Sequence, residues 1–143
     1  MKHILIVNGP NLNMLGERQP EIYGNASFDT ILESLRQRYD DIDIDYFQSN
    51  HEGHLIDRIQ KAYLTDKKDA IILNGGGYSH TSVALADAVA AVDIPVVEVH
   101  LSNIYAREPF RHHSLLSPVC CGVIAGFGAS VYALAIDAIK SRL

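Results

Sequence analysis

Two residue pairs have the types and spacing needed for acid–base chemistry. Glu98 and His100 lie two positions apart in the apolar run Ile94–His100, so in a strand their side chains point the same way. A neighbouring carboxylate fixes the tautomer of an imidazole and supports its protonated form, which makes His100 a candidate general acid. A histidine satisfied structurally at a strand end also fits this spacing.

Arg18 and Tyr23 form the second pair, five positions apart in a polar segment that runs from Asn8 to about Ala26. An arginine beside a phenol favours the phenolate and lowers its pKa, which turns a tyrosine into a usable general base. The alternative is that Tyr23 packs and Arg18 is solvated. The segment has about 17 residues without a helical pattern, and such long loops are usually functional.

The other polar candidates are individually weaker. His80 follows Gly75–Gly77 and opens a helix, where backbone N–H groups favour an anionic or hydroxylated ligand. On this feature alone, a capping or solvent-facing histidine is the better explanation. The glycines match no nucleotide-binding motif and are explained by a turn. His51 and His54 lack zinc-protease spacing and a third ligand, so no metal site is predicted.

Absent groups narrow the chemistry further. The five lysines are Lys2, Lys61, Lys67, Lys68 and Lys140. None of them lies in the polar segments that follow the predicted strands, so no lysine amine is placed to form a Schiff base with a substrate. No G-x-S-x-G elbow is present either. What remains is acid–base chemistry on a small polar, anionic molecule, carried out by Tyr, His and Arg without a cofactor.

Alternating apolar runs predict the elements that position these residues. Strands are expected at His3–Asn8, Ile42–Gln48, Ala70–Asn74, Ile94–His100 and around Val119–Ala125. Helices are expected after an N-cap at Ser27 and at Glu52–Leu64, Thr81–Val92 and Ser130–Lys140. This alternation predicts an α/β fold, a three-layer doubly wound sheet of five parallel strands with helices on both faces.

Ligands of such sheets bind beyond the carboxyl ends of the strands. That rule selects Asn8–Tyr23, Gln48–Gly53, Asn74–His80, His100–Arg111 and Gly126–Gly128, the segments that hold the candidates above.

Composition limits the remaining function classes. The 143 residues predict one domain, residues 1–143, and a net charge of −5 argues against nucleic acid as a partner. No window approaches the roughly 18 apolar residues of a membrane span. The adjacent Cys120 and Cys121 are expected to be buried, reduced thiols of a cytoplasmic protein.

Ordered motifs along nearly the whole chain resemble one family, the type II 3-dehydroquinate dehydratases. They are Val7–Asn13, Leu15-Gly16, Pro20–Gly24, Gln48–Asn50, Glu52-Gly53, Tyr78–Leu85, Glu98–Asn103, Ala106–Glu108, Phe110–Ser114 and Gly126–Gly128. The resemblance implies a flavodoxin-like fold and trimers packed into a dodecamer. It also implies anti elimination of water from 3-dehydroquinate through an enolate, giving 3-dehydroshikimate, in aromatic amino acid biosynthesis or quinate breakdown, without metal, cofactor or imine.

The resemblance also implies residue roles. Tyr23 would be the base, kept ionised by Arg18 with help from Arg107, and Asn11 would position the group that stabilises the enolate. His100, oriented by Glu98, would protonate the departing hydroxyl.

The remaining implied roles concern substrate binding. Leu101 and Ser102 would bind the substrate carboxylate, whereas the ring hydroxyls would contact Asn74, His80 and Arg111. Asp87 matches a residue that a neighbouring subunit contributes to the site in the family.

A departure from the family pattern in one loop, and two alternative functions, accompany the resemblance. The family usually reads Asn-Pro-Gly-Ala-Tyr-Thr-His where this chain has Asn74 to His80 with three glycines, which predicts a more mobile loop and weaker substrate binding. The alternatives are a non-catalytic flavodoxin-like module that binds flavin or nucleotide, and an inactive relative kept as an oligomeric scaffold.

Overall fold

The central sheet has five parallel strands in the order β2-β1-β3-β4-β5 among the residues described by the computed structural model, 1–17 and 27–143. The strands are β1 (Lys2–Asn8), β2 (Ile42–Gln48), β3 (Ala70–Asn74), β4 (Val96–His100) and β5 (Gly122–Ala125). This is the flavodoxin-like strand order, so the predicted fold class is confirmed.

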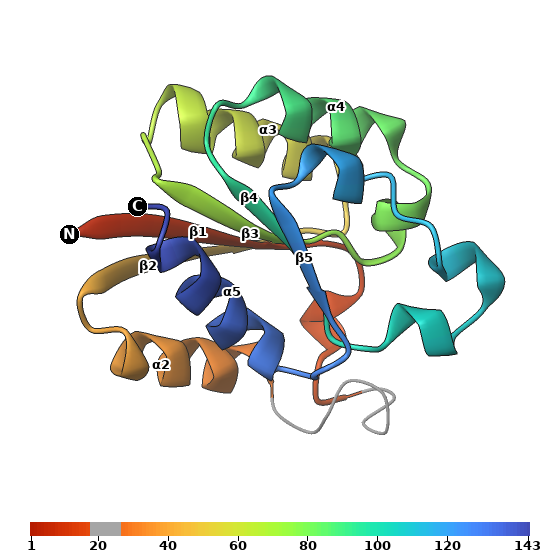
Figure 1. Cartoon of the computed structure of the whole chain (residues 1–143), viewed down its shortest axis with the longest axis horizontal. Coiled ribbons are helices and arrows are strands. Elements are labelled where there is room, and N and C mark those ends of the chain that lie inside the picture. The colour runs from red at the N-terminus through yellow and green to blue at the C-terminus, as the bar shows by residue number, and fades with distance from the viewer. Residues whose placement is uncertain (18–26) are drawn as a thin grey trace.

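Two helices cover each face of the sheet (Figure 1). α2 (Phe28–Arg38) and α5 (Ser130–Lys140) lie on one face, and α3 (Glu52–Leu64) and α4 (Val83–Ala91) lie on the other. Alternate residues of β1 serve the two layers: Ile4 and Ile6 join the core beneath α2 and α5, whereas Leu5 and Val7 join the core beneath α3 and α4. This two-sided burial explains why the strands read as continuous apolar runs rather than as alternating ones.

The last two strands and α4 are shorter than the sequence predicts. β4 begins at Val96 rather than Ile94, because Pro95 has no N–H to donate to a ladder. β5 begins at Gly122 rather than near Val119, because Ser117–Val119 forms a 3₁₀ helix that contains Pro118. α4 begins at Val83 because Ser82 is its N-cap, and the Ser82 hydroxyl accepts from the Leu85 N–H at 2.8 Å.

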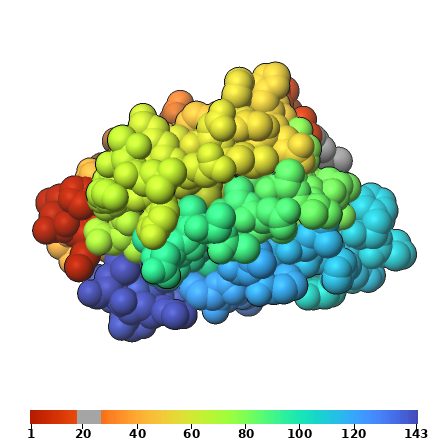
Figure 2. Space-filling view, turned by 90° about the horizontal axis from the view of Figure 1, so that it is seen from above, coloured from red at the N-terminus to blue at the C-terminus, as the bar shows by residue number. Residues whose placement is uncertain are grey.

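The prediction of two buried thiols is wrong for one of them. Cys120 is partly buried, and burial raises the pKa of its thiol to about 12, but Cys121 is exposed. Cys121 immediately precedes β5, which is an edge strand and reaches solvent on its open side. Figure 2 shows the molecule from above, with the residues of α4 (green) lying between those of α3 (yellow) and those that lead into β5 (blue). Within the described part of the chain, no helix is long and apolar enough to cross a membrane.

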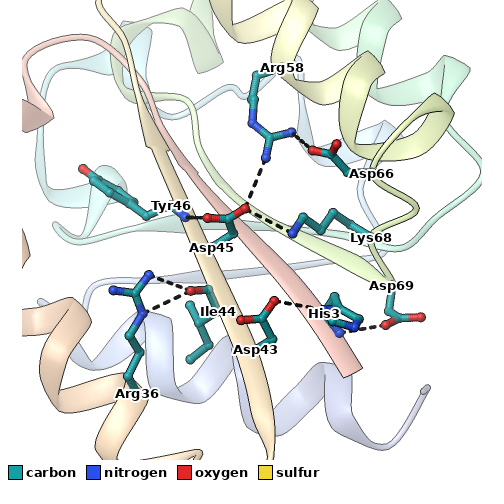
Figure 3. Close-up of polar contacts among 10 residues, drawn as sticks. All are labelled: His3, Arg36, Asp43, Ile44, Asp45, Tyr46, Arg58, Asp66, Lys68 and Asp69. Atoms are coloured by element: carbon teal, nitrogen blue, oxygen red, sulfur yellow. Dashed lines mark hydrogen bonds and ion pairs between the residues drawn. The ribbon is translucent and has the colours of Figure 1, made fainter. Parts of the chain in front are cut away.

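Charged side chains occupy the opposite edge of the sheet, along β2 (Figure 3). Arg36 of α2 donates two hydrogen bonds to the Ile44 carbonyl, from Nε at 3.1 Å and from Nη2 at 2.8 Å. Farther along, Asp45 pairs with Lys68 at 3.1 Å and with Arg58 at 3.6 Å. These contacts satisfy or shield the edge strand, which would otherwise be available for pairing with another chain.

Candidate active site

Three polar residues end adjacent strands in one row. Asn8 of β1 lies in register with Gln48 of β2 on one side and with Asn74 of β3 on the other. A pocket opens beyond this row, near the point where the strand order reverses. Its described lining is Pro10, Asn11, Leu12, Leu15, Asn74, Gly76, Gly77, His80, His100, Leu101, Ser102, Ile104, Arg107 and Arg111.

A buried hydrogen-bond relay fixes Asn74 at the floor of this pocket. The Tyr132 hydroxyl of α5 donates to Asn8 Oδ1 at 2.7 Å and accepts from Asn74 Nδ2 at 3.1 Å. Asn74 Oδ1 in turn accepts from the Gly76 N–H at 3.2 Å. Burial raises the pKa of Tyr132, so its hydroxyl stays neutral and remains a donor. The amide of Asn74 therefore has one fixed orientation, with its second N–H left for a ligand.

Two loops pack against each other to form one wall. A side chain on Gly9 would place its Cβ 2.6 Å from the Gly75 carbonyl oxygen, so only glycine allows this approach. Gly76 has a φ of +56° and lies against Pro10. Asn11 follows with a φ of +70°, and its N–H donates to Asn50 Oδ1 at 2.9 Å. This geometry brings Asn11 to the pocket beside the Gly76 turn.

Glu98 and His100 form a buried acid–base pair at the end of β4. Their side chains lie on one face of the strand, and Glu98 Oε2 makes a short contact with His100 Nε2. Burial alone raises the pKa of Glu98, but hydrogen bonds from His100, Ser117 and Ser114 outweigh it and hold that pKa below its usual value. Because the carboxylate engages Nε2, Nδ1 is the ring nitrogen left to exchange a proton with a bound molecule.

His80 stacks against His100, with ring centroids 5.9 Å apart and 23° between the planes. Its Nδ1 donates to the His113 carbonyl at 2.8 Å, which leaves Nε2 as an acceptor. Burial lowers the pKa of His80, and the nearby His100 and Arg111 lower it further, although the bond to His113 opposes them. A neutral His80 can accept a hydrogen bond from a ligand hydroxyl.

The segment after β4 supplies the cationic side of the pocket. Backbone bonds hold it in place, from Gly126 N–H to the His100 carbonyl at 3.1 Å and from Gly128 N–H to the Leu101 carbonyl at 2.9 Å. Arg107 Nη1 donates to Ser102 Oγ at 3.4 Å, and Arg111 Nε bonds Glu108 Oε2 at 2.6 Å. Two guanidinium groups at one pocket favour an anionic ligand.

Comparisons with known proteins agree with this geometry. The family model described as "Dehydroquinase class II" matches residues 2–140. The chain belongs to the class II dehydroquinase family. It is 50% identical to the 3-dehydroquinate dehydratase of Caldicellulosiruptor bescii over 100% of this chain and 99% of that protein. The protein of the same name from Dinoroseobacter shibae is 55% identical, covering 99% of this chain and 94% of that protein.

A solved structure supports the same family membership. The type II dehydroquinase of Butyrivibrio crossotus superposes with a TM-score of 0.94 at 44% identity, covering 97% of each chain. The class II dehydroquinase fold therefore accounts for nearly the whole chain, and fold similarity is accompanied by substantial sequence identity.

The structure brings most of the predicted site residues of the chain together. Those that line the pocket are Asn11, Asn74, His80, His100, Leu101, Ser102, Arg107 and Arg111. Glu98 lies behind His100, fully buried. Asp87 is exposed on α4 and is not part of the described lining. Arg18 and Tyr23 lie outside the described residues.

Sequence reasoning missed two kinds of site residue. Leu12, Leu15 and Ile104 give the pocket apolar walls, and their types carry no chemical signal in the sequence. Ser114 and Ser117 bond the Glu98 carboxylate from positions 16 and 19 residues farther along the chain. Only the fold reveals contacts at that separation, because no local spacing rule links the two segments.

Proposed function

We propose that this chain is a 3-dehydroquinate dehydratase that converts 3-dehydroquinate to 3-dehydroshikimate by anti elimination of water through an enolate. The observation that carries the proposal is the buried Glu98–His100 pair at a pocket flanked by Arg107 and Arg111. An acid beside two cations suits an anionic substrate that must lose a hydroxyl group.

Proton abstraction is the first step of the proposed reaction. Tyr23, ionised by Arg18 with help from Arg107, takes the proton alpha to the ketone, and the C–H electrons form the enolate. Asn11 positions the donor that stabilises the enolate oxygen. The presence of Asn11 and Arg107 in the pocket lining supports this assignment.

Loss of the hydroxyl is the second step. His100 gives its Nδ1 proton to the departing oxygen, the carbon–oxygen bond breaks, and water leaves while the enolate electrons form the new double bond. Glu98 stabilises the imidazolium before the transfer and keeps the ring oriented during it. All of this is proton transfer by side chains, so the proposed mechanism assigns no role to a metal or an organic cofactor.

Substrate binding uses the remaining pocket residues. Backbone N–H groups of Leu101 and Ser102 bind the substrate carboxylate, while Asn74, His80 and Arg111 contact the ring hydroxyls. The exposed position of Asp87 on α4 supports its contribution to the site of a neighbouring copy. The active form is then a homo-oligomer, a dodecamer built from trimers, in which residues 1–143 form a single catalytic domain that acts in the cytoplasm.

A direct absorbance assay tests the function. Purified protein is mixed with 3-dehydroquinate, and the conjugated enone carboxylate of the product is followed in the ultraviolet, with chelator present and with borohydride in a parallel sample. We expect product formation that is indifferent to both additions. A flat trace with measurable substrate binding would identify an inactive relative, and a flat trace without binding would overturn the proposal.

Replacing Tyr23 with Phe tests the proposed base. The change keeps the ring and removes the ionisable oxygen, so kcat should fall by about 10²–10⁴-fold while substrate binding survives. Tyr63→Phe is a matched control, because Tyr63 lies on α3 away from the described pocket lining. Wild-type turnover in Tyr23→Phe would refute the assignment of the base.

A further inference from the structure

Glu98 is a fully buried carboxylate with donors on both of its oxygens. Ser117 Oγ donates to Oε1 at 2.6 Å, and Ser114 Oγ donates to Oε2 at 2.7 Å. Oε2 also bonds His100 Nε2. Both serines come from the segment between Arg111 and β5, and their bonds to Glu98 join this segment to β4.

The turn that holds these serines directs their hydroxyls. Ser114 Oγ accepts from the Leu116 N–H at 3.1 Å and from the Ser117 N–H at 3.3 Å. These bonds occupy its lone pairs, so its proton points to Glu98. Ser117 begins the 3₁₀ helix Ser117–Val119 and is only partly buried. The two hydroxyls are therefore donors preset by the backbone.

Hydrogen bonds to an ionised carboxylate favour its charged form. Three further groups affect the pair electrostatically. His80 is stacked on His100, Arg111 is near His80, and the thiol of Cys120 is neutral because burial, followed by the charge of Glu98, raises its pKa. None of these bonds the carboxylate among the described residues, so the serines are its hydrogen-bond donors besides His100.

We propose that Ser117 and Ser114 are positioning residues of the dehydration: they keep Glu98 ionised and aimed at His100, and thereby set how readily His100 gives up its proton. This inference rests on the proposed function, in which His100 is the acid. Neither serine is in the pocket lining, so each acts through Glu98 rather than on the substrate.

Ser117→Ala in the full chain tests the inference, because Ser114 also caps its turn and is the less specific target. Without the Ser117 donor, Glu98 holds the His100 proton more tightly. The imidazole resonances of His100, followed by NMR in the free protein as the pH is varied, should therefore change at a higher pH in the variant than in the wild type. The alkaline limb of kcat should move in the same direction, and kcat near neutral pH should fall about threefold to tenfold with KM unchanged.

Two further variants separate the hydroxyl from the fold. Ser117→Thr keeps the hydroxyl at a partly exposed position and should restore both the His100 titration and the alkaline limb. Ser141→Ala removes a hydroxyl that bonds the Ala138 carbonyl near the C-terminus, and should change neither readout.

An unmoved His100 titration in folded Ser117→Ala would overturn the inference, as would a Ser117→Thr variant that behaves like Ser117→Ala. If the wild-type chain fails to turn over 3-dehydroquinate, the proposed function falls. The NMR titration still decides the role of Ser117 in that case, since it needs no substrate.

Discussion

Replacing Tyr132 with Phe would test the buried relay beneath the pocket. The aromatic ring stays, and so does its edge-on contact with Phe28, whose centroid is 5.0 Å away. What the variant loses is the hydroxyl that joins Asn8 to Asn74. The side chain of Tyr132 is fully buried, so water does not readily replace the missing oxygen.

The expected loss follows from the two partners left behind. Asn8 Oδ1 loses its donor at 2.7 Å and Asn74 Nδ2 loses its acceptor at 3.1 Å, and both asparagines are buried. A buried polar atom without a partner costs about 1–3 kcal/mol, so we expect the free energy of unfolding to fall by about 2–4 kcal/mol. This is a large share of the roughly 5–15 kcal/mol that stabilises a typical domain.

Guanidinium denaturation followed by circular dichroism, at one fixed protein concentration, measures this difference. Tyr39→Phe is the matched control. The Tyr39 hydroxyl bonds Asp137 Oδ1 at 2.7 Å, but the Asp137 side chain is 48% exposed and water can replace the lost donor. The control should lose less than about 1 kcal/mol. Equal losses in the two variants, or a loss below about 1 kcal/mol for Tyr132→Phe, would refute the reasoning.

Three other outcomes are expected. Gly77→Ala should stabilise the protein by about 0.5 kcal/mol in the same denaturation assay, since nothing lies near its Cβ, whereas Gly76→Ala should destabilise it because of the φ of +56°. Arg36→Ala should leave the Ile44 carbonyl unsatisfied and increase aggregation measured by light scattering. Folding lowers the pKa of His80 from 6.5, so the stability that neutral His80 contributes is present above that pH and is lost as the pH falls. The free energy of unfolding of His80→Asn should therefore decrease less than that of the wild type between about pH 7 and pH 5, as measured by the same denaturation assay.

The fold could be predicted because its strands are buried on both faces. Segments such as Ile4–Val7 and Ala70–Leu73 are wholly buried. Short, continuous apolar segments of that length are typical of strands that are buried on both faces. The ends of β4 and β5 could not be placed, because Pro95 and Pro118 interrupt ladder pairing without changing the apolar pattern.

Some contacts of the candidate site could likewise be predicted from the sequence, and others could not. Glu98 and His100 could be paired from sequence, because a two-residue spacing in a strand fixes a shared face. The serines on Glu98 and the Tyr132 hydroxyl on Asn74 could not, because these contacts join segments that only the folded chain brings together. Periodicity shows that Tyr132 is buried in α5 but not where its hydroxyl points. The solvent exposure of Cys121 could not be predicted either, because the sequence of an edge strand has the same apolar pattern as that of an interior strand.

The measurement that bears most directly on the central claim is turnover of 3-dehydroquinate by His100→Gln, with binding measured separately by calorimetry. The variant keeps a polar side chain but cannot deliver the Nδ1 proton, so kcat should fall by about 10²–10⁴-fold with affinity nearly unchanged. His54→Gln, at an exposed position on α3, should match the wild type. Wild-type kcat in folded His100→Gln would contradict the account, because the buried Glu98–His100 pair would then not be the acid of the reaction.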